Sequence, residues 1–284
     1  MGQVVVRGPG RGNVVCDLDG VVYLDLEEVP GAGDALRELE RQDHRLLFVT
    51  NNSTSSPGTA AERIAQLTDY PAAVSQVLTS ALAVARMLAA DRPRCLVVGG
   101  AGIEEALDGE GIPRTENWRR AEAVVVGLDR RLTYERLRDA TLALRAGARF
   151  LATNVDPTLP TPEGQWPGAG SIVAALEAAS DRRPEIAGKP HQPMRELVRS
   201  RLGPGPTWVV GDRPSTDLAM ARAEGWRAVL VLSGVAVDPG AGGHEHAPDL
   251  VVESLADLPG ALAAASGPPG PAGGGTGGAG GEQG

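Results

Sequence analysis

Short apolar runs alternate with longer amphipathic stretches along most of this chain. The apolar runs predict strands at Asn13–Asp17, Arg45–Thr50, Arg94–Gly99, Ala123–Gly127, Arg149–Thr153, Glu185–Gly188, Thr207–Gly211 and Ala228–Leu232. The stretches with apolar residues at helical spacing predict helices at Asp34–Gln42, Thr59–Leu67, Gly102–Leu107, Tyr134–Arg145, Ser171–Ala179, Pro193–Leu202 and Ser215–Glu224. Alternation of this kind predicts parallel sheets covered by helices and joined by right-handed crossovers.

Length and composition narrow the class of protein. A chain of 284 residues corresponds to roughly two domains. Hydrophobic residues make up 42% of it and aromatic residues 3%, so the core must be mainly aliphatic. The formal net charge of -9 gives no electrostatic basis for binding nucleic acid or an anionic membrane. Any attraction for an anionic substrate must therefore come from a local lysine or metal ion.

Other features exclude several further classes. Cys16 and Cys95 each lie in an apolar run, which indicates buried strand cysteines rather than a disulfide or a metal site. Neither a secretory signal nor an apolar run long enough to span a membrane is present, so we expect a cytoplasmic protein. The tail at 266–284 is nearly all Gly, Pro and Ala, a composition typical of disorder.

Two carboxylates stand where the first predicted strand ends. Asp17 and Asp19 follow the run Val14-Val15-Cys16, and Gly20 lets the backbone turn sharply after them. Ligands of parallel sheets bind at the carboxyl ends of the strands. Two carboxylates crowded there would repel each other, so we expect a cation between them. An acidic turn after a strand is the alternative, and this motif alone does not exclude it.

Three later strand ends carry polar residues that suit a phosphate and its metal ion. Thr50 and Asn51 offer a hydroxyl, an amide and backbone N–H groups to phosphate oxygens. Lys189, the single lysine of an arginine-rich chain, can neutralise a phosphate as a point charge. Asp212 can complete an oxygen-rich magnesium site with Asp17, while Asp217 can hold the loop or a metal-bound water.

Together these segments resemble a known enzyme family. The set Asp17-x-Asp19-Gly-Val, Thr50-Asn51, Gly-Lys189-Pro and Gly-Asp212-Arg-x-x-Thr-Asp217 is similar to the haloacid dehalogenase (HAD) superfamily. Within it, the chain resembles the branch of NagD-like, p-nitrophenyl-phosphatase and phosphoglycolate-phosphatase enzymes. Segments 125–130, 152–156 and 167–171 agree with the cap region of that branch, and the resemblance covers about residues 12–262.

The resemblance implies a fold and its division into domains. It implies a Rossmann-like parallel-sheet core with an inserted α/β cap. The first part of the core would be 1–80, the cap 81–184, the second part of the core 185–265, and the remaining 266–284 a disordered tail. By analogy the cap closes over the phosphate site and selects the leaving group. The resemblance also allows a homodimer formed through the cap.

The same resemblance implies a Mg²⁺-dependent phosphatase for small-molecule phosphate monoesters. Asp17 would attack phosphorus to form an aspartyl-phosphate, and Asp19 would protonate the leaving oxygen and then activate water. The ion would be held by Asp17, the backbone carbonyl of Asp19, and Asp212. The phosphoryl oxygens would be held by Thr50, Asn51, Asn52 and Lys189, with Asp217 outside this set in a supporting position.

Three other functions stay open at this point. The turn Val98-Gly99-Gly100-Ala101-Gly102 suggests a dinucleotide-binding site, but it lacks the full glycine spacing and the acid expected about 20 residues later. A non-catalytic phospho-acceptor could use the same Asp, Thr and Lys, but an inserted cap would obstruct a protein donor. A phosphomutase or phosphotransferase would use the same intermediate. The physiological phosphate ester is not readable from the sequence, because the cap side chains set it.

Overall fold

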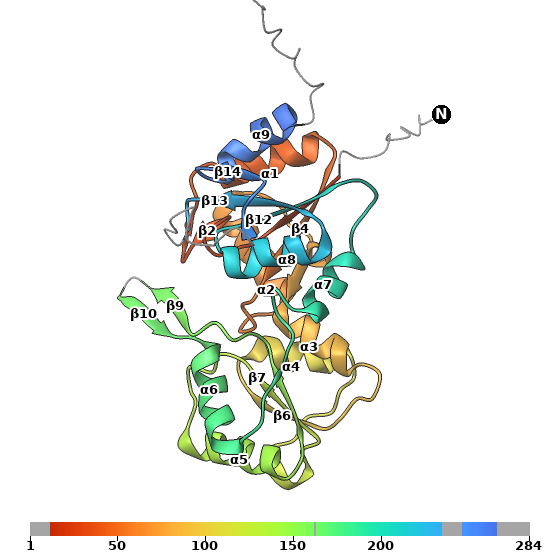
Figure 1. The fold of residues 1–284 in the computed structure, drawn as a ribbon, viewed down its shortest axis with the longest axis vertical. Coiled ribbons are helices and arrows are strands. Elements are labelled where there is room, and N and C mark those ends of the chain that lie inside the picture. The colour runs from red at the N-terminus through yellow and green to blue at the C-terminus, as the bar shows by residue number, and fades with distance from the viewer. Residues whose placement is uncertain (1–11, 162, 235–245, 266–284) are drawn as a thin grey trace, which may run out of the picture.

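The computed structural model describes residues 12–161, 163–234 and 246–265, and their strands form two main sheets. Figure 1 shows two bodies along the long axis, with red, orange and blue segments in the upper body and yellow and green segments in the lower one. We call them the large lobe, built on the six-stranded sheet, and the small lobe, built on the four-stranded sheet. From Gly12 the described chain runs through the large lobe, passes through the small lobe and returns. The tail predicted at 266–284 lies outside the described residues.

The large lobe has a parallel sheet in the order β14-β13-β12-β1-β4-β5. Its strands are β1 (Gly12–Cys16), β4 (His44–Thr50), β5 (Val77–Thr79), β12 (Thr207–Gly211), β13 (Arg227–Val231) and β14 (Leu250–Val252). Val15 of β1 lies opposite Leu47 on one side and Val209 on the other. The strand order therefore reverses around β1, and such a switch point is where open α/β sheets bind ligands.

Helices cover both faces of this sheet because its strands are apolar on both faces. The helices are α1 (Ala32–Arg41), α2 (Pro57–Thr68), α3 (Ser80–Leu88), α7 (Gln192–Arg199), α8 (Ala219–Glu224) and α9 (Leu258–Ala265). Apolar side chains of α1, α2 and α9 share a buried cluster with Val14 and Cys16 of β1. Those of α3, α7 and α8 share another with Val15. The alternation along β1 thus divides the core into two layers.

The small lobe repeats this design on a smaller scale. Its parallel sheet has the order β11-β8-β7-β6, with β6 at Cys95–Val98, β7 at Ala123–Val126, β8 at Arg149–Ala152 and β11 at Glu185–Ile186. Helices α5 (Tyr134–Arg145) and α6 (Ala169–Ser180) pack on one face, over Leu96 and Val98. On the other face, α4 (Ala101–Gly109) and α3 join Cys95 and Val97 to the cluster that contains Val15. One apolar cluster therefore connects both sheets.

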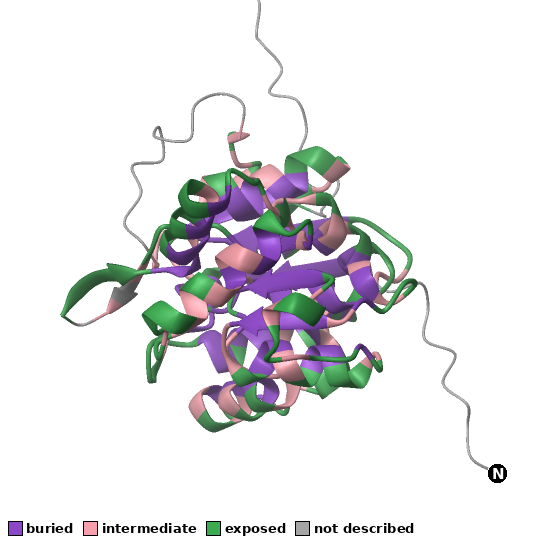
Figure 2. Cartoon of the chain, turned by 90° about the horizontal axis from the view of Figure 1, so that it is seen from below, coloured by how far each residue is buried: buried purple, intermediate pink, exposed green. Residues whose placement is uncertain are grey.

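Two antiparallel hairpins lie outside these layers. One pairs β2 (Tyr23–Leu24) with β3 (Glu27–Glu28), and the other pairs β9 (Thr158–Thr161) with β10 (Gly164–Pro167). Figure 1 shows β9 and β10 projecting sideways from the small lobe. The residues of β10 are exposed, whereas the central strands in Figure 2 are almost wholly buried. The β9–β10 hairpin thus contributes little to the core.

The predicted α/β architecture with parallel sheets is confirmed. Thr207–Gly211 and Tyr134–Arg145 have the bounds that the sequence predicts, but Ser215–Glu224 divides into a π-helical turn at Pro214–Leu218 followed by α8. The hairpins and β5, β14, α3 and α9 were not predicted. The division into domains at residues 80 and 184 stays a prediction, although β11 pairs with β8 and so joins the small sheet rather than the core.

Both cysteines are buried, in line with their apolar surroundings. Burial raises the pKa of the Cys16 thiol to about 12, and the neighbouring Asp17 carboxylate adds to the rise. Burial likewise raises the pKa of Cys95 to about 12. Both thiols are therefore protonated core side chains at neutral pH. Within the described ranges, no helix has the combination of length and hydrophobicity that a membrane span requires.

Candidate active site

Asp17 lies directly after β1, at the carboxyl edge of the large sheet. Its backbone N–H donates to the Val210 carbonyl at 2.9 Å, which continues the pairing of β1 with β12 by one residue. One carboxylate oxygen of Asp17 accepts a hydrogen bond from the Leu18 N–H at 2.7 Å. Only 9% of Asp17 is exposed. The first predicted carboxylate is thus held in a fixed orientation at the centre of the sheet.

Asp19 occupies a different environment. Its side chain is exposed to a cavity, whereas the Asp17 side chain is buried. The cavity walls still displace most of the surrounding solvent, which raises the pKa of Asp19 to about 6, and the Asp17 charge adds to the rise. Arg63 and Lys189 act in the opposite direction. A carboxyl group with this pKa can both donate and accept a proton near neutral pH.

Lys189 links two of the carboxylates. Its Nζ lies 2.8 Å from an Asp17 oxygen and 2.7 Å from an Asp217 oxygen, and it donates to the Val49 carbonyl at 2.9 Å. Burial of Lys189 disfavours its charge, but the Asp17 and Asp217 carboxylates outweigh this effect and raise its pKa. Burial also raises the pKa of Asp217, and Lys189 opposes that rise. The lysine is therefore a fixed, buried cation beside Asp17.

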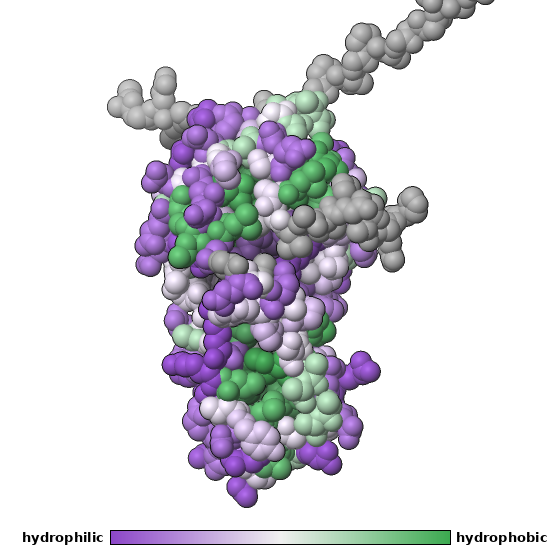
Figure 3. All heavy atoms as spheres, turned by 90° about the vertical axis from the view of Figure 1, so that its left-hand side faces the viewer, coloured by the Kyte–Doolittle hydropathy of each residue, from purple (hydrophilic) through white to green (hydrophobic). Residues whose placement is uncertain are grey.

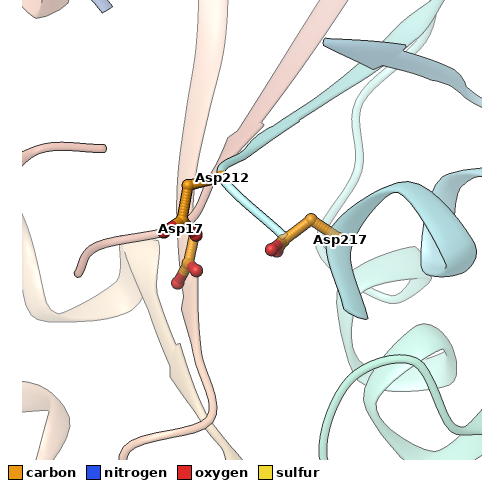
Figure 4. Close-up of side chains that lie close together, drawn as sticks. All are labelled: Asp17, Asp212 and Asp217. Carbon is orange, nitrogen blue, oxygen red and sulfur yellow. The ribbon is translucent and has the colours of Figure 1, made fainter. Parts of the chain in front are cut away.

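Asp17, Asp212 and Asp217 form the carboxylate cluster of the site. One oxygen of each lies within 4.8 Å of the others, and all three residues are buried. Figure 4 shows the Asp17 and Asp212 side chains adjacent to each other, with the Asp217 side chain pointing towards them from its helix. The Lys189 ammonium lies between Asp17 and Asp217, one cation among three carboxylates. An excess of negative oxygen ligands in a buried group suits Mg²⁺, so these residues fit the ion that the sequence predicts.

Glycines allow the backbone to come this close to the acids. Gly20 has a φ of 87°, and a Cβ on it would lie 2.5 Å from an Asp212 carboxylate oxygen. A Cβ on Gly234 would lie 2.2 Å from the same oxygen, and a Cβ on Gly211 would lie 2.2 Å from Cγ of Asp217. Side chains at these positions would displace the carboxylates.

The loop after β4 brings in the predicted phosphate-binding residues. The hydroxyl of Thr50 accepts a hydrogen bond from the Asn52 N–H at 3.0 Å. The Asn52 side chain accepts from the Thr54 N–H at 3.0 Å and from the Thr54 hydroxyl at 2.7 Å. The Asn51 side chain accepts from the Lys189 N–H at 2.7 Å, so this loop and the lysine segment are bonded to each other.

A cavity of about 980 Å³ connects these groups. From the large lobe it is lined by the predicted site residues Asp17, Asp19, Thr50, Asn51, Asn52, Lys189 and Asp212. From the small lobe it is lined by residues of three segments, among them Arg130, Asp156 and Trp166. The cavity therefore lies between the lobes, with the carboxylate cluster on the large-lobe side.

Apolar side chains also line the cavity. Leu24 and Leu26 of the first hairpin are 48% and 70% exposed, and Trp166 of the second hairpin is 38% exposed, with the Arg130 guanidinium 5.7 Å from its ring centroid. Figure 3 shows apolar areas in both the upper and the lower parts of the molecule, with hydrophilic atoms around them. The two hairpins thus present apolar groups to one space.

The structure brings together every residue that the sequence predicts for the site, but the members of the carboxylate cluster differ from the predicted metal ligands. Asp217, expected in a supporting position, is part of the buried carboxylate cluster, while the Asp19 carboxylate is not part of it. Sequence reasoning missed Arg63, Arg130, Trp166 and Arg213 as cavity residues. No local motif marks Arg63, whereas Arg130 and Arg213 lie within the segments that resemble the family and were given no role there. Asp156 was noted only within a family-like segment, although it bonds to Asn51.

Two family models match the chain. A haloacid dehalogenase-like hydrolase model matches residues 14–113, and a HAD-hydrolase-like model matches residues 186–258. The two ranges contain every predicted site residue. The stretch 114–185 between them forms much of the small lobe.

Several characterised proteins are similar over most of this chain. The 5'-nucleotidase YutF of Bacillus subtilis (strain 168) is 36% identical over 223 residues, which cover 77% of this chain and 86% of that protein. The D-glycerol 3-phosphate phosphatase of Mycobacterium tuberculosis is 38% identical over 226 residues, which cover 78% of this chain and 63% of that protein. The crystal structure of the M. tuberculosis glycerol phosphate phosphatase Rv1692 in complex with magnesium superposes with a TM-score of 0.80 at 35% identity, covering 87% of this chain and 75% of that one.

Proposed function

Because this chain belongs to the haloacid dehalogenase-like hydrolases, we propose that it is a Mg²⁺-dependent phosphatase that hydrolyses small-molecule phosphate monoesters through an aspartyl-phosphate on Asp17. One observation carries the proposal: the Asp17 carboxylate lies 2.8 Å from the buried Lys189 ammonium, in a carboxylate cluster beside a cavity of about 980 Å³. A nucleophile, a fixed cation and space for a leaving group therefore lie together.

In the first step, an Asp17 oxygen attacks phosphorus and the bond from phosphorus to the ester oxygen breaks. The leaving oxygen takes a proton from Asp19. The pKa of about 6 at Asp19 leaves an appreciable protonated fraction near neutral pH. In the second step, Asp19 takes a proton from water as the water attacks the aspartyl-phosphate. Inorganic phosphate leaves, and Asp17 and Asp19 return to their starting states.

Charge neutralisation and alignment account for most of the catalysis of phosphoryl transfer. Lys189 supplies a cation that its partners hold in place, so it needs no reorganisation during the reaction. Thr50, Asn51 and Asn52 add polar groups at the adjacent strand end. Asp17 and Asp212, with the Asp19 backbone carbonyl, would hold Mg²⁺, which when bound offsets negative charge on the phosphoryl oxygens.

The alternatives involve the same intermediate. A phosphomutase would return the phosphoryl group to a sugar phosphate, and a phospho-acceptor would keep it. The exposed carboxyl of Asp19 beside Asp17 favours hydrolysis, because it can activate water. The names of the relatives suggest 5'-nucleotides and glycerol phosphates as first substrates to assay. A homodimer through the small lobe and a cytoplasmic location belong to the same proposal.

The test is a panel of phosphate monoesters with Mg²⁺, assayed for inorganic phosphate beside Asp17→Asn and with excess chelator. We expect steady turnover by the wild-type chain, loss with chelator, and a fall of more than about 10³-fold for Asp17→Asn, which removes the nucleophile and keeps the binding groups. A single stoichiometric release would indicate an acceptor, and transfer within a sugar bisphosphate would indicate a mutase. A rate near that of wild type for Asp17→Asn would rule out the aspartyl-phosphate.

A further inference from the structure

The Asn51 side chain is engaged by protein partners at both ends of its amide. Its Oδ1 accepts from the Lys189 N–H at 2.7 Å, and its Nδ2 donates to the Lys189 carbonyl at 3.3 Å. Nδ2 also donates to Oδ2 of Asp156 at 3.3 Å. The amide therefore brackets the backbone of Lys189, the residue that supplies the buried ammonium of the site.

The small lobe holds Asn51 through a second set of contacts. The backbone carbonyl of Asn51 accepts from Nδ2 of Asn154 at 2.8 Å. Ser80 of α3, in the large lobe, donates its hydroxyl to the same carbonyl at 2.7 Å. Asn154 in turn accepts from the Asp156 N–H at 3.1 Å. The loop 153–156, directly after β8, thus bonds both the main chain and the side chain of Asn51.

Close backbone packing leaves this junction little freedom. A Cβ on Gly188 would lie 2.5 Å from Oδ1 of Asn51 and 2.4 Å from the Thr153 carbonyl. A Cβ on Gly102 would lie 2.5 Å from the Ser55 carbonyl, and the Gly102 N–H donates to the Thr54 carbonyl at 3.2 Å. The glycine-rich turn that suggested a dinucleotide site is therefore filled by the loop after β4.

We propose that Asn51 is a positioning residue that acts through Lys189, and that Asp156 and Asn154 of the small lobe set its orientation. The contacts of Asp156 and Asn154 that hold the small lobe against Asn51 would then also position the Lys189 ammonium. The sequence predicts Asn51 as a phosphate ligand; here its amide instead orients the lysine that binds phosphate. The kinetic part of this inference rests on the proposed function.

Three single variants distinguish an effect of Asp156 on the orientation of Asn51 from an effect of its charge and from a general loss of stability. Asp156→Ala removes the acceptor for Asn51, and we expect kcat to fall about tenfold with KM changed by less than about threefold, because small misplacements of catalytic groups are costly. Asp156→Asn keeps an acceptor oxygen, so its kcat should stay within about threefold of wild type.

Thr153→Val is the control for general stability, because it breaks the buried 3.0 Å contact with the Ser53 hydroxyl in the same junction. It should lower the unfolding temperature and leave kcat within about twofold.

A double-variant cycle tests whether Asp156 acts through Asn51. In an Asn51→Ala background, adding Asp156→Ala should lower kcat by less than about twofold, because the hydrogen bond between these two side chains is already absent. Additive losses would overturn the inference. Asp156→Asn as damaging as Asp156→Ala would also overturn it, because that result assigns Asp156 a charge contact with substrate.

Amide hydrogen exchange gives a readout that needs no turnover. The Lys189 N–H is the donor to Asn51, so its exchange should quicken by about fivefold or more in Asp156→Ala and not in Asp156→Asn or Thr153→Val. Unchanged exchange in Asp156→Ala, or equal acceleration in Thr153→Val, would refute the positioning role. If the wild-type chain hydrolyses no monoester, the proposed function fails while this comparison still decides the inference.

Discussion

At the scale of single residues, the site depends on how closely backbone and carboxylates approach each other. Lys189 is 4% exposed and holds its ammonium between Asp17 and Asp217. Gly20 supplies the turn after Asp19 and leaves room for Asp212. Since a buried charge without its partner is costly, each of these residues constrains the others.

Gly20→Ala and Gly225→Ala form a matched pair for this constraint. Both glycines have positive φ, 87° and 68°, so either alanine should cost about 1 kcal/mol of folding stability. A Cβ on Gly20 meets Asp212, whereas a Cβ on Gly225 meets no atom within 4 Å. We expect Gly20→Ala to lower kcat at least about tenfold and Gly225→Ala to leave it unchanged. Steady-state kinetics and thermal unfolding of both variants check this, and equal activities would contradict it.

At the scale of elements, strand ends place the chemistry and helix starts stabilise the elements around it. Helix α5 begins after Thr133, whose hydroxyl accepts from the Arg136 N–H at 3.2 Å. Such a cap satisfies one of the N–H groups that the first helical turn leaves without an intrahelical partner. Thr141 lies inside the same helix, and its hydroxyl donates to the Leu137 carbonyl at 2.8 Å.

Thr133→Ala should therefore lower the free energy of unfolding by about 1 kcal/mol. Thr141→Ala should have little effect or a small stabilising one, because alanine has the higher helix propensity and the lost bond only competes with the backbone. Urea unfolding of the two variants measures the difference. A loss for Thr141→Ala as large as that for Thr133→Ala would show that the cap has no special role.

At the scale of the whole molecule, the shared apolar cluster joins the two lobes. It contains Val15 and Leu47 of the large sheet, Val125 and Leu151 of the small sheet, and Ile103 of α4 between them. Because neither sheet can expose this cluster without affecting the other, the lobes should unfold together.

Fluorescence from single-tryptophan variants tests that cooperativity. Trp118 packs against the small-lobe cluster and Trp208 lies in β12, so each reports on one lobe. We expect coincident urea transitions for the two probes. Ile103→Ala should destabilise both by the same amount, about 2 to 5 kcal/mol, because Ile103 is fully buried in the shared cluster. Separate midpoints for Trp118 and Trp208 would show that the lobes unfold independently.

Local pattern was sufficient for much of the fold and for the candidate residues. The central strands β1, β4 and β12 are buried on both faces and lead into polar residues, so Asp17, Thr50 and Asp212 could be identified from the sequence. Lys189 follows the short edge strand β11, and its motif Gly-Lys-Pro identified it. Helix α5 has its predicted bounds because its apolar and polar positions alternate at helical spacing. Helix α3 was missed because its run Ser80–Leu88 is short and mostly apolar, with Arg86 as its one charged residue, and was not separated from the apolar residues around it.

The sequence by itself determined which residue types stand at which strand ends, because burial and turn chemistry are encoded within a few neighbouring positions. Only the tertiary structure decided which ends meet. The order of strands places β12 beside β1 and thereby Asp212 near Asp17. The bonds of Asn51 to Lys189 and to Asp156 join residues 138 and 105 positions apart. Contacts over such separations depend on how the lobes pack, and no local pattern of apolar and polar residues contains that information.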